Sequence, residues 1–567
     1  MAGVSGPHGR SLRCKWTPTA SFARGGINTP FFLLARWTHT TSRPRMPSPK
    51  TTLLRVLAAP HETTGPPTMR HGLAPETLSL GDDELLQFLY ASLPEPPVST
   101  FPSLCCAADE DKTDRVSRLP DDILRRVVSL LPAKDGARTT VLSSRWRGLW
   151  HSAPLVLADT HLLPGGDAGV RPARAGAASR AITNAVSAAL EAHPGPFPFA
   201  SLTCSFIDGA DRPVLARWFQ LLATNGVDVL VFVNRPWPLP GLRLPSSLFS
   251  CASLRLLWIG AWAFPDTTTL PRGAAFPNLR ELVLGCAVMG DKDLEFVLAV
   301  SPVLETLAVT GSQTRLHARL ANPSLRCAYF CLSILEEVTV EDAPSLERLL
   351  FWNNKSLNKT SRTVKIGRAP KLCLLGYLEP GVHTLQIGDT IIKAGTKAST
   401  STTVSSVQML ALRLRFGVRS EVKMLPSFLR CFPSVGTLIV QSEETLEPTR
   451  KLSVKFWECT SPIECVQSHL KTLLFRELQG SCNEFKFLTF IAENAQKLER
   501  MYIEVKMGPS RSAREVMATK LRALKSANWA SRDCQMLFRT SKVLRRSTVW
   551  SLEMGACLSF DDPFFCD

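Results

Sequence analysis

The sequence predicts an α/β chain in which three short helices precede a long stacked array of short strands. Two observations carry this expectation. Residues 119–150 hold apolar side chains at helical spacing, interrupted by proline and serine. From about residue 202 onward, a frame spaced as Leu-x-x-Leu-x-Leu recurs at intervals of about 25 residues. The length of 567 residues also exceeds what one hydrophobic core normally holds, which favours several units or a repeat array.

The first helix is predicted to begin at Pro120, because proline suits the first helical position and loses no hydrogen bond there. Asp121 and Asp122 follow it and complement the positive end of the helix dipole. Five apolar residues then recur at helical spacing: Ile123, Leu124, Val127, Val128 and Leu131. Pro132 ends the helix, since the residue before a proline is pushed out of helical geometry.

A second helix is predicted from Asp135, which can accept hydrogen bonds from the free amides of its first turn. Its inward residues are expected to be Ala137 and Val141, with Leu142 as a third candidate. The third helix places three apolar residues on one face: Trp146, Leu149 and Trp150. Three helices of this size cannot enclose all of these side chains, so another protein should cover part of the apolar surface.

Two motifs within this stretch resemble a known family. Leu119 to Leu124 read Leu-Pro-Asp-Asp-Ile-Leu, and Leu142 to Trp150 read Leu-Ser-Ser-Arg-Trp-Arg-Gly-Leu-Trp. With Leu130-Leu131-Pro132 between them, these residues resemble an F-box of the plant type. The resemblance implies a helix set that docks on a Skp-type adaptor and, through it, on the cullin of a ubiquitin ligase. The alternative is an ordinary three-helix hydrophobic core.

Nine apolar residues are the candidates for adaptor docking. They are Leu119, Pro120, Ile123, Leu124, Val127, Leu131, Leu142, Trp146 and Trp150. Some of them must also hold the three helices together. For Trp146 and Trp150, this role in the core competes with docking.

The strand array rests on ten copies of the apolar frame. They begin at Leu254, Leu279, Leu304, Leu325, Leu346, Leu372, Val407, Val435, Leu470 and Leu498. Weaker half-copies begin at Leu335 and Val382. The period is typical of leucine-rich repeats, in which each unit gives one strand plus a helix or loop and buries its leucines against the next unit.

The segments between the frames predict an irregular horseshoe. Amphipathic stretches indicate outer helices over 291–300, 421–431 and 484–495, and a further helix over 178–192 precedes the array. The asparagine or cysteine expected eight residues after the first leucine is mostly replaced; the residues found there are Trp262, Ala287, Ser312, Ser333 and, as the exception, Asn354. Residues 470–501 resemble the FBD region found at the C-terminus of plant F-box proteins.

We therefore expect six segments. They are a disordered tail and linker (1–112), the F-box (113–154), a connecting helical segment (155–201), the leucine-rich-repeat solenoid (202–465), FBD-like C-terminal repeats (466–540) and a tail (541–567). The segment before Glu62 holds nine basic residues and no acidic one, a composition shared by organelle transit peptides and poorly ordered tails. We favour a tail, because organelles do not house the ligase that the F-box implies. Within the linker, residues 82–93 form an acidic amphipathic stretch whose apolar residues are Leu85, Leu86, Phe88, Leu89 and Leu93.

Composition argues against several other classes of function. The net charge is +17, but nine of the excess positive charges precede Glu62, so the remainder is too mild to indicate nucleic-acid binding. No run of eighteen apolar residues is present, so no membrane partner is expected. The sixteen cysteines lack zinc or disulfide spacing, and no catalytic motif is found. We expect no metal, no cofactor and no enzyme active site.

A row of residues four positions after each first leucine should face the inner side of the arc, because side chains alternate along a strand. The row is Trp258, Val283, Ala308, Tyr329, Leu350, Gly376, Ala411, Ile439, Leu474 and Tyr502. It is mostly apolar, which indicates a protein partner or cover by the chain itself. The candidate substrate-binding residues are Trp258, Tyr329, Leu350, Ile439 and Tyr502, with the first two as anchors. The alternative is that irregular strands turn these side chains into the core.

The sequence thus predicts a substrate receptor of an SCF-type (Skp-cullin-F-box) ubiquitin ligase, which acts in the nucleus or cytoplasm. The F-box would bind the adaptor, and the repeats would hold a target protein. The alternative is a repeat scaffold that binds protein without ligase function. A third class, nucleic-acid binding, rests on net charge alone.

Overall fold

The structure is a computed structural model of the chain. It describes residues 93–94, 116, 118–129, 131, 133–151, 154–158, 175–204, 207, 209–234, 242–270, 273–312, 314–352, 362–397, 399–445, 456–506 and 511–540. Apart from Leu93 and Pro94, the predicted tail and linker over 1–112 lie outside these residues, as does the predicted tail over 541–567. Contacts divide the chain into Met1–Ser48 and Pro49–Asp567, and every element below belongs to the second unit.

Three short helices come first among the described elements, as the F-box motifs predict. They are α3 (Asp121–Ser129), α4 (Ala133–Thr139) and α5 (Ser144–Trp150). Longer helices follow at α7 (Ala175–Ala192), α8 (Arg212–Thr224), α9 (Asp291–Ala299), α10 (Arg419–Arg430), α11 (Cys482–Asn494) and α12 (Arg511–Lys525). Short helical turns lie at Gly209–Asp211, Ser246–Ser250, Thr267–Thr269 and Cys465–His469. The predicted helices over 178–192, 291–300, 421–431 and 484–495 are confirmed with small shifts at their ends.

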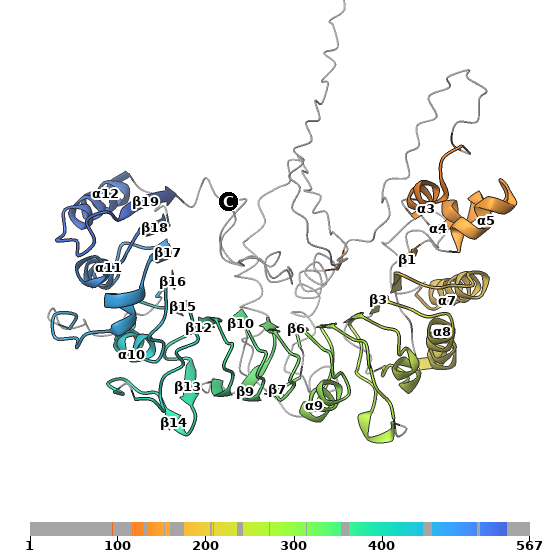
Figure 1. Cartoon of the computed structure of the whole chain (residues 1–567), viewed down its shortest axis with the longest axis horizontal. Coiled ribbons are helices and arrows are strands. Elements are labelled where there is room, and N and C mark those ends of the chain that lie inside the picture. The colour runs from red at the N-terminus through yellow and green to blue at the C-terminus, as the bar shows by residue number, and fades with distance from the viewer. Residues whose placement is uncertain are drawn as a thin grey trace, which may run out of the picture. The chain divides into compact units, whose positions relative to one another are not determined.

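A parallel sheet runs through the rest of the described chain. In spatial order its fourteen strands are β1 (Leu155–Ala158), β2 (Ala200–Cys204), β3 (Val229–Asn234), β4 (Leu256–Gly260), β5 (Glu281–Gly285), β6 (Thr306–Thr310), β8 (Cys327–Cys331), β10 (Arg348–Trp352), β12 (Leu374–Leu378), β15 (Met409–Leu414), β16 (Thr437–Ser442), β17 (Thr472–Leu478), β18 (Arg500–Val505) and β19 (Gln535–Thr540). The strands from β4 to β18 match the ten predicted frames. Figure 1 shows them following a curved line with helices along the outer side. The predicted α/β solenoid is confirmed.

The register of the sheet explains the leucine frame. Leu257 pairs with Leu282, and Ile259 pairs with Leu284, so equivalent residues of neighbouring repeats stand side by side. These side chains belong to a core that also contains residues of the outer helices, such as Leu294 and Val297 of α9. Each repeat thus buries its leucines against the next one and against a helix.

A second sheet replaces helices on the outer side in the middle of the array. It consists of β7 (Leu316–Leu320), β9 (Leu335–Asp342), β11 (Arg362–Arg368), β13 (His383–Ile387) and β14 (Thr390–Ile391). The weak half-copies that begin at Leu335 and Val382 coincide with β9 and β13. They are therefore strands of this outer sheet, in which Val338 pairs with Val364 and Val364 pairs with Leu385.

Local hydrogen bonds replace the asparagine ladder that the sequence lacks. The hydroxyl of Ser333 lies 3.2 and 3.0 Å from the carbonyl oxygens of Val309 and Cys331, which share its single proton, and it accepts a hydrogen bond from the amide of Ser312. Helix α11 begins with a reciprocal cap between Ser481 and Glu484. The fully buried Glu484 carboxylate also accepts a hydrogen bond from the hydroxyl of Ser442 at 2.6 Å, which ties the helix to β16.

Buried His383 makes the stability of this core depend on pH. Its Nδ1 atom accepts a hydrogen bond from the amide of Glu379 at 2.8 Å, and burial lowers its pKa from 6.5 to about 4 despite the opposing charge of Glu379. The neighbouring charges of Arg362 and Arg413 lower this pKa further. Below pH 6.5 this histidine therefore binds a proton in the unfolded chain but stays neutral in the folded chain. The free energy of unfolding falls as the pH drops toward 4.

When the pH is lowered from 7 to 5, we expect this histidine to decrease the unfolding free energy of the wild-type protein by about 2 kcal/mol. In His383→Asn the side-chain oxygen can accept the same hydrogen bond, but no proton is taken up. Urea unfolding at both pH values should show a smaller loss for the variant, because contributions from other groups are common to both proteins. Equal losses would contradict the assignment.

Candidate protein-interaction surfaces

The three helices of the F-box bury five apolar residues in the core that continues into the array. They are Leu124, Val128, Trp146, Leu149 and Trp150, each at most 8% exposed. Trp150 lies over Gly136, where a Cβ atom would approach the indole Cζ3 to 2.7 Å. The small residue in α4 is therefore what lets α5 pack closely.

Polar contacts hold the start of α3 against α5. The guanidinium of Arg145 donates from Nε to the Asp121 carboxylate at 2.6 Å and from a terminal nitrogen to the carbonyl oxygen of Leu119, also at 2.6 Å. The Leu-Pro-Asp-Asp motif and the Ser-Arg-Trp motif, which are far apart in sequence, are thus joined. This pairing fixes the orientation of the surface on which Pro120 and Ile123 lie.

The nine predicted docking residues fall into three groups. Leu124, Trp146 and Trp150 are buried; Leu119, Val127 and Leu131 are partly buried; Pro120, Ile123 and Leu142 are exposed. Ile123 is 42% exposed and Leu142 is 64% exposed. Val141, which we expected to point inward with Leu142 as a further candidate, is 83% exposed; both residues follow the end of α4 at Thr139, so the inward placement was wrong for both. The exposed set, Pro120, Ile123, Val141 and Leu142, is called the F-box apolar surface below.

Trp150 also connects the F-box to the segment that follows α7. Its ring meets His193 edge-on at 5.1 Å between centroids, and His193 stacks on Phe197 at 4.8 Å. All three side chains are buried. Trp150 is therefore a structural contact between the F-box and the start of the array.

The inner face of the parallel sheet carries a second apolar cluster, separate from the core shared with the helices. Its buried members are Phe199, Val231, Val233, Trp258, Ala261, Val283, Cys286, Ala308, Cys327, Tyr329, Cys331, Leu350, Trp352, Leu374, Tyr377, Ala411, Ile439 and Leu474. Tyr502 and Leu93 pack against it and are partly buried. We call the buried members together with Tyr502 the inner apolar surface.

The five predicted substrate-binding residues all belong to the inner apolar surface. Trp258, Tyr329, Leu350 and Ile439 are at most 2% exposed, and Tyr502 is partly buried. The indole of Trp258 lies flat along its strand, since a Cβ atom at Gly260 would come within 2.4 Å of Cζ3. These residues lie on the face opposite the outer helices, in a cluster distinct from the leucine core.

A polar row that the sequence reasoning missed lies two residues beyond the apolar row on the last strands. Arg413 pairs with Gln441, and Gln441 pairs with Arg476, across β15, β16 and β17. The guanidinium of Arg413 sits 4.4 Å from the ring centroid of Trp352 and forms ion pairs with Glu379 and Glu443. Arg413, Gln441 and Arg476 lie six positions after the first residue of their frames. Because side chains alternate along a strand, that spacing places them on the same face as the apolar row, and it could have revealed them from the sequence.

This polar row is buried, and its arginines contact neighbouring carboxylates and a tyrosine hydroxyl. Arg476 donates a hydrogen bond to the hydroxyl of Tyr377 at 3.3 Å, and both side chains are at most 3% exposed. Burial lowers the pKa of Arg362, which pairs with Glu379 at 3.9 Å. Burial raises the pKa of Glu504 despite the nearby charge of Arg476. Hydrogen-bonding groups thus adjoin the inner apolar surface at its C-terminal end.

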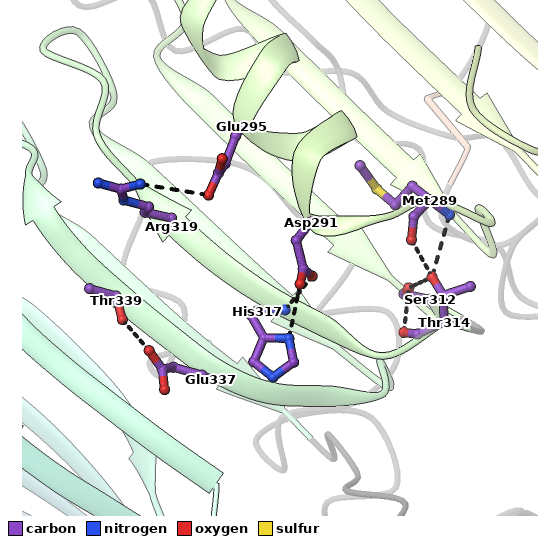
Figure 2. Close-up of polar contacts among 9 residues, drawn as sticks. All are labelled: Met289, Asp291, Glu295, Ser312, Thr314, His317, Arg319, Glu337 and Thr339. Atoms are coloured by element: carbon purple, nitrogen blue, oxygen red, sulfur yellow. Dashed lines mark hydrogen bonds and ion pairs between the residues drawn. The ribbon is translucent and has the colours of Figure 1, made fainter. Parts of the chain in front are cut away.

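The outer sheet presents a different, exposed polar face (Figure 2). Asp291, the first residue of α9, accepts hydrogen bonds from the amide and the ring nitrogen of His317 at 2.7 and 3.0 Å. Arg319 pairs with Glu341 at 2.6 Å and approaches Glu295 of α9 to 4.0 Å. Exposed ion pairs of this kind contribute little to stability, and they form a charged surface unlike the inner one.

Comparison with known proteins adds three family matches in the order seen in the structure. The F-box domain matches residues 116–157, the leucine-rich repeats of FBD-associated F-box protein At5g56370 match residues 215–440, and the FBD family matches residues 458–503. The chain therefore resembles F-box/leucine-rich-repeat proteins with an FBD region, and the three matched regions follow one another along it. The FBD match includes β17, α11 and the start of β18.

Relatives from Arabidopsis thaliana carry names that include F-box, FBD or leucine-rich-repeat terms. F-box/LRR-repeat protein 13 is 24% identical over 435 residues, which cover 70% of this chain and 90% of the relative. FBD-associated F-box protein At5g60610 is 23% identical over 408 residues, which cover 68% of this chain and 98% of the relative. Putative F-box/FBD/LRR-repeat protein At4g00315 is 28% identical over 207 residues, 35% of this chain and 42% of the relative.

Among the described residues, no group of three or more His, Cys, Asp or Glu side chains could hold a metal ion. No helix in the same part of the chain is long and apolar enough to cross a bilayer. Burial raises the pKa of the Cys251, Cys286 and Cys465 thiols to about 12, so they are not activated nucleophiles.

Proposed function

We propose that this chain is the substrate-recognition subunit of an SCF-type ubiquitin ligase. The F-box would dock on a Skp-type adaptor and, through it, on a cullin, while the leucine-rich repeats would bind the target protein. The chain itself would be non-catalytic, and other subunits would transfer ubiquitin. The observation that carries the proposal is the F-box apolar surface, which remains exposed while other apolar residues of the same helices are buried.

The argument from exposure is physical. Ile123, Val141 and Leu142 contribute nothing to the buried core of the F-box, and each leaves apolar area in contact with water. Several exposed apolar side chains on one small helical unit favour a protein-binding site. Arg145 holds this surface in place through Asp121 and the Leu119 carbonyl, so it is organised before a partner arrives.

We further propose that the target protein binds on the inner face of the array. Trp258, Tyr329, Leu350, Ile439 and Tyr502 would supply apolar contacts, and aromatic residues tend to carry much of the energy of an interface. The adjoining polar row around Arg413 and Gln441 would form hydrogen bonds that orient the bound target protein. Substitutions on the outer sheet, which carries solvated ion pairs, serve as controls for substitutions on the inner face.

Affinity purification tests the proposal. The full chain should retain a Skp-type adaptor and a cullin in stoichiometric amounts through size-exclusion chromatography. Absence of the adaptor from the purified complex, with the chain folded by circular dichroism, would contradict it.

The site of action that we propose is the nucleus or cytoplasm, where such ligases act. Removing residues 1–61 should change neither the location nor adaptor binding, because this basic, acid-free segment lacks the apolar pattern of a packed element. Fluorescent fusions of the intact and shortened chains provide the comparison. Import of the intact chain into mitochondria or chloroplasts, with removal of its N-terminus, would overturn the proposal.

A further inference from the structure

We propose that the inner apolar surface is a docking site for the chain's own segment around Leu93, which precedes the F-box. The inference concerns contacts within one molecule, and it holds whether or not the protein serves a ubiquitin ligase. A target protein that binds the inner face would have to displace this segment first. Three observations carry it: the burial of the inner apolar surface, the identity of the residue that packs on it, and the sequence that surrounds this residue.

The first observation is that the inner apolar surface is buried without a layer of helices. The helices α9, α10 and α11 contribute to the leucine core on the other side of the sheet. On the inner side, Tyr329 is 0% exposed and Trp258 is 2% exposed. Neighbouring strands cover the flanks of a side chain that stands on a sheet, but they leave its tip open. Rings that lie flat, such as that of Trp258, and neighbouring side chains account for part of this burial, and a segment lying over the face would cover the tips that they leave open.

The second observation identifies the covering segment. Leu93 packs against the inner apolar surface and is itself partly buried. Every other described member of that cluster lies between Val156 and Tyr502, within or next to the strands. Leu93 is thus the one described contact that the surface makes with a part of the chain outside the array. An apolar side chain reaching this face from the linker is what intramolecular docking requires.

The third observation is the sequence around Leu93. Leu85, Leu86, Phe88 and Leu89 precede it at a spacing that predicts an amphipathic helix, and acidic residues occupy positions 82–84. An amphipathic segment that lays its apolar stripe on an apolar groove is a common mode of peptide recognition. The chemistry of the segment therefore matches the surface on which Leu93 is found.

The length of the tether favours this segment over a second copy of the chain. Between Leu93 and the start of α3 at Asp121 the chain can span up to about 90 Å at ~3.3 Å per residue. A tethered segment also competes at an effective concentration in the millimolar range, which a separate molecule rarely reaches. The segment can thus occupy the inner face within one molecule.

Cysteines on the two faces of the sheet provide the test. Cys327 and Cys331 belong to the inner apolar surface, whereas Cys251 and Cys465 belong to the leucine core on the opposite side. All four are free and buried. The experiment measures the rate at which N-ethylmaleimide modifies each thiol in the folded full-length chain, resolved by mass spectrometry of its peptides. It compares the wild type with Leu93→Asp, with the conservative Leu93→Met and with Ile391→Asp on the outer sheet as the matched control.

In Leu93→Asp, modification of Cys327 and Cys331 should be at least about tenfold faster than in the wild type, while Cys251 and Cys465 stay protected. Leu93→Met and Ile391→Asp should behave like the wild type. Unchanged protection of Cys327 and Cys331, both in Leu93→Asp and in a chain lacking residues 1–112, would overturn the proposal, because the strands alone would then seal the surface. Faster modification of all four thiols would overturn it as well, since Leu93 would then support the whole core.

Discussion

Replacing both Ile123 and Leu142 with aspartate should abolish binding of the Skp-type adaptor while leaving the protein folded. Both side chains are exposed, so the helices do not need them, and an interface would have to bury two unpaired carboxylates in their place. We expect the affinity to fall at least about 100-fold, equivalent to ~3 kcal/mol. Isothermal titration calorimetry with purified adaptor measures this directly.

Two comparisons make that result specific. Ile391→Asp, at an exposed apolar residue of the outer sheet, should bind the adaptor with wild-type affinity. Trp146→Ala should lower both stability and binding, because the indole is buried in the F-box core. Wild-type affinity of the Ile123/Leu142 double variant would show that the adaptor, if it binds at all, uses a different face.

Asn322→Ala should destabilise the array by about 2–4 kcal/mol. The Asn322 side chain is 1% exposed and makes four hydrogen bonds to the backbone. Its amide nitrogen donates to the carbonyl oxygens of Leu298 and Ser301, and its oxygen accepts from the amides of Ser324 and Leu325. The alanine variant would leave these buried groups without partners. Denaturant unfolding provides the measurement.

Asn278 is the matched control for this prediction. It also donates through its amide nitrogen to a backbone carbonyl, that of Ala252 at 2.9 Å, but it does so at an exposed position where water can replace the bond. Asn278→Ala should therefore change the unfolding free energy by less than about 1 kcal/mol. Similar effects of the two substitutions would contradict the importance of burial at Asn322.

The sequence predicted the part of the fold that repeats. The ten leucine frames coincide with strands β4 to β18 because each frame must bury its three apolar residues in the same core. The period could not distinguish the two sheets: the half-copies at Leu335 and Val382 follow the same spacing but form outer strands. Strands β1, β2 and β3 were not predicted, because a short apolar run such as Val229–Asn234 does not show the leucine frame.

At the candidate sites, the sequence identified the apolar residues that take part in packing or docking. It could not predict which of these residues contact the core and which contact solvent. Helical spacing placed Trp146 and Trp150 on one face but could not tell a core residue from a docking residue, because both are apolar. The three-dimensional arrangement of α3, α4 and α5 decides this by burying Leu124 and exposing Val141. The polar row of Arg413, Gln441 and Arg476 was missed because only the apolar position of each strand had been followed.

The fate of captured proteins tests the central claim most directly. Proteins that bind the full chain in cells should be identified once for the wild type and once for the Ile123→Asp/Leu142→Asp variant, and their ubiquitination and half-lives should be measured in both cases. A substrate receptor predicts that both forms capture the same target, and that only the wild type increases its ubiquitination and shortens its half-life. Equal ubiquitination and equal half-lives with the two forms would contradict the account and would favour a binding scaffold without ligase function.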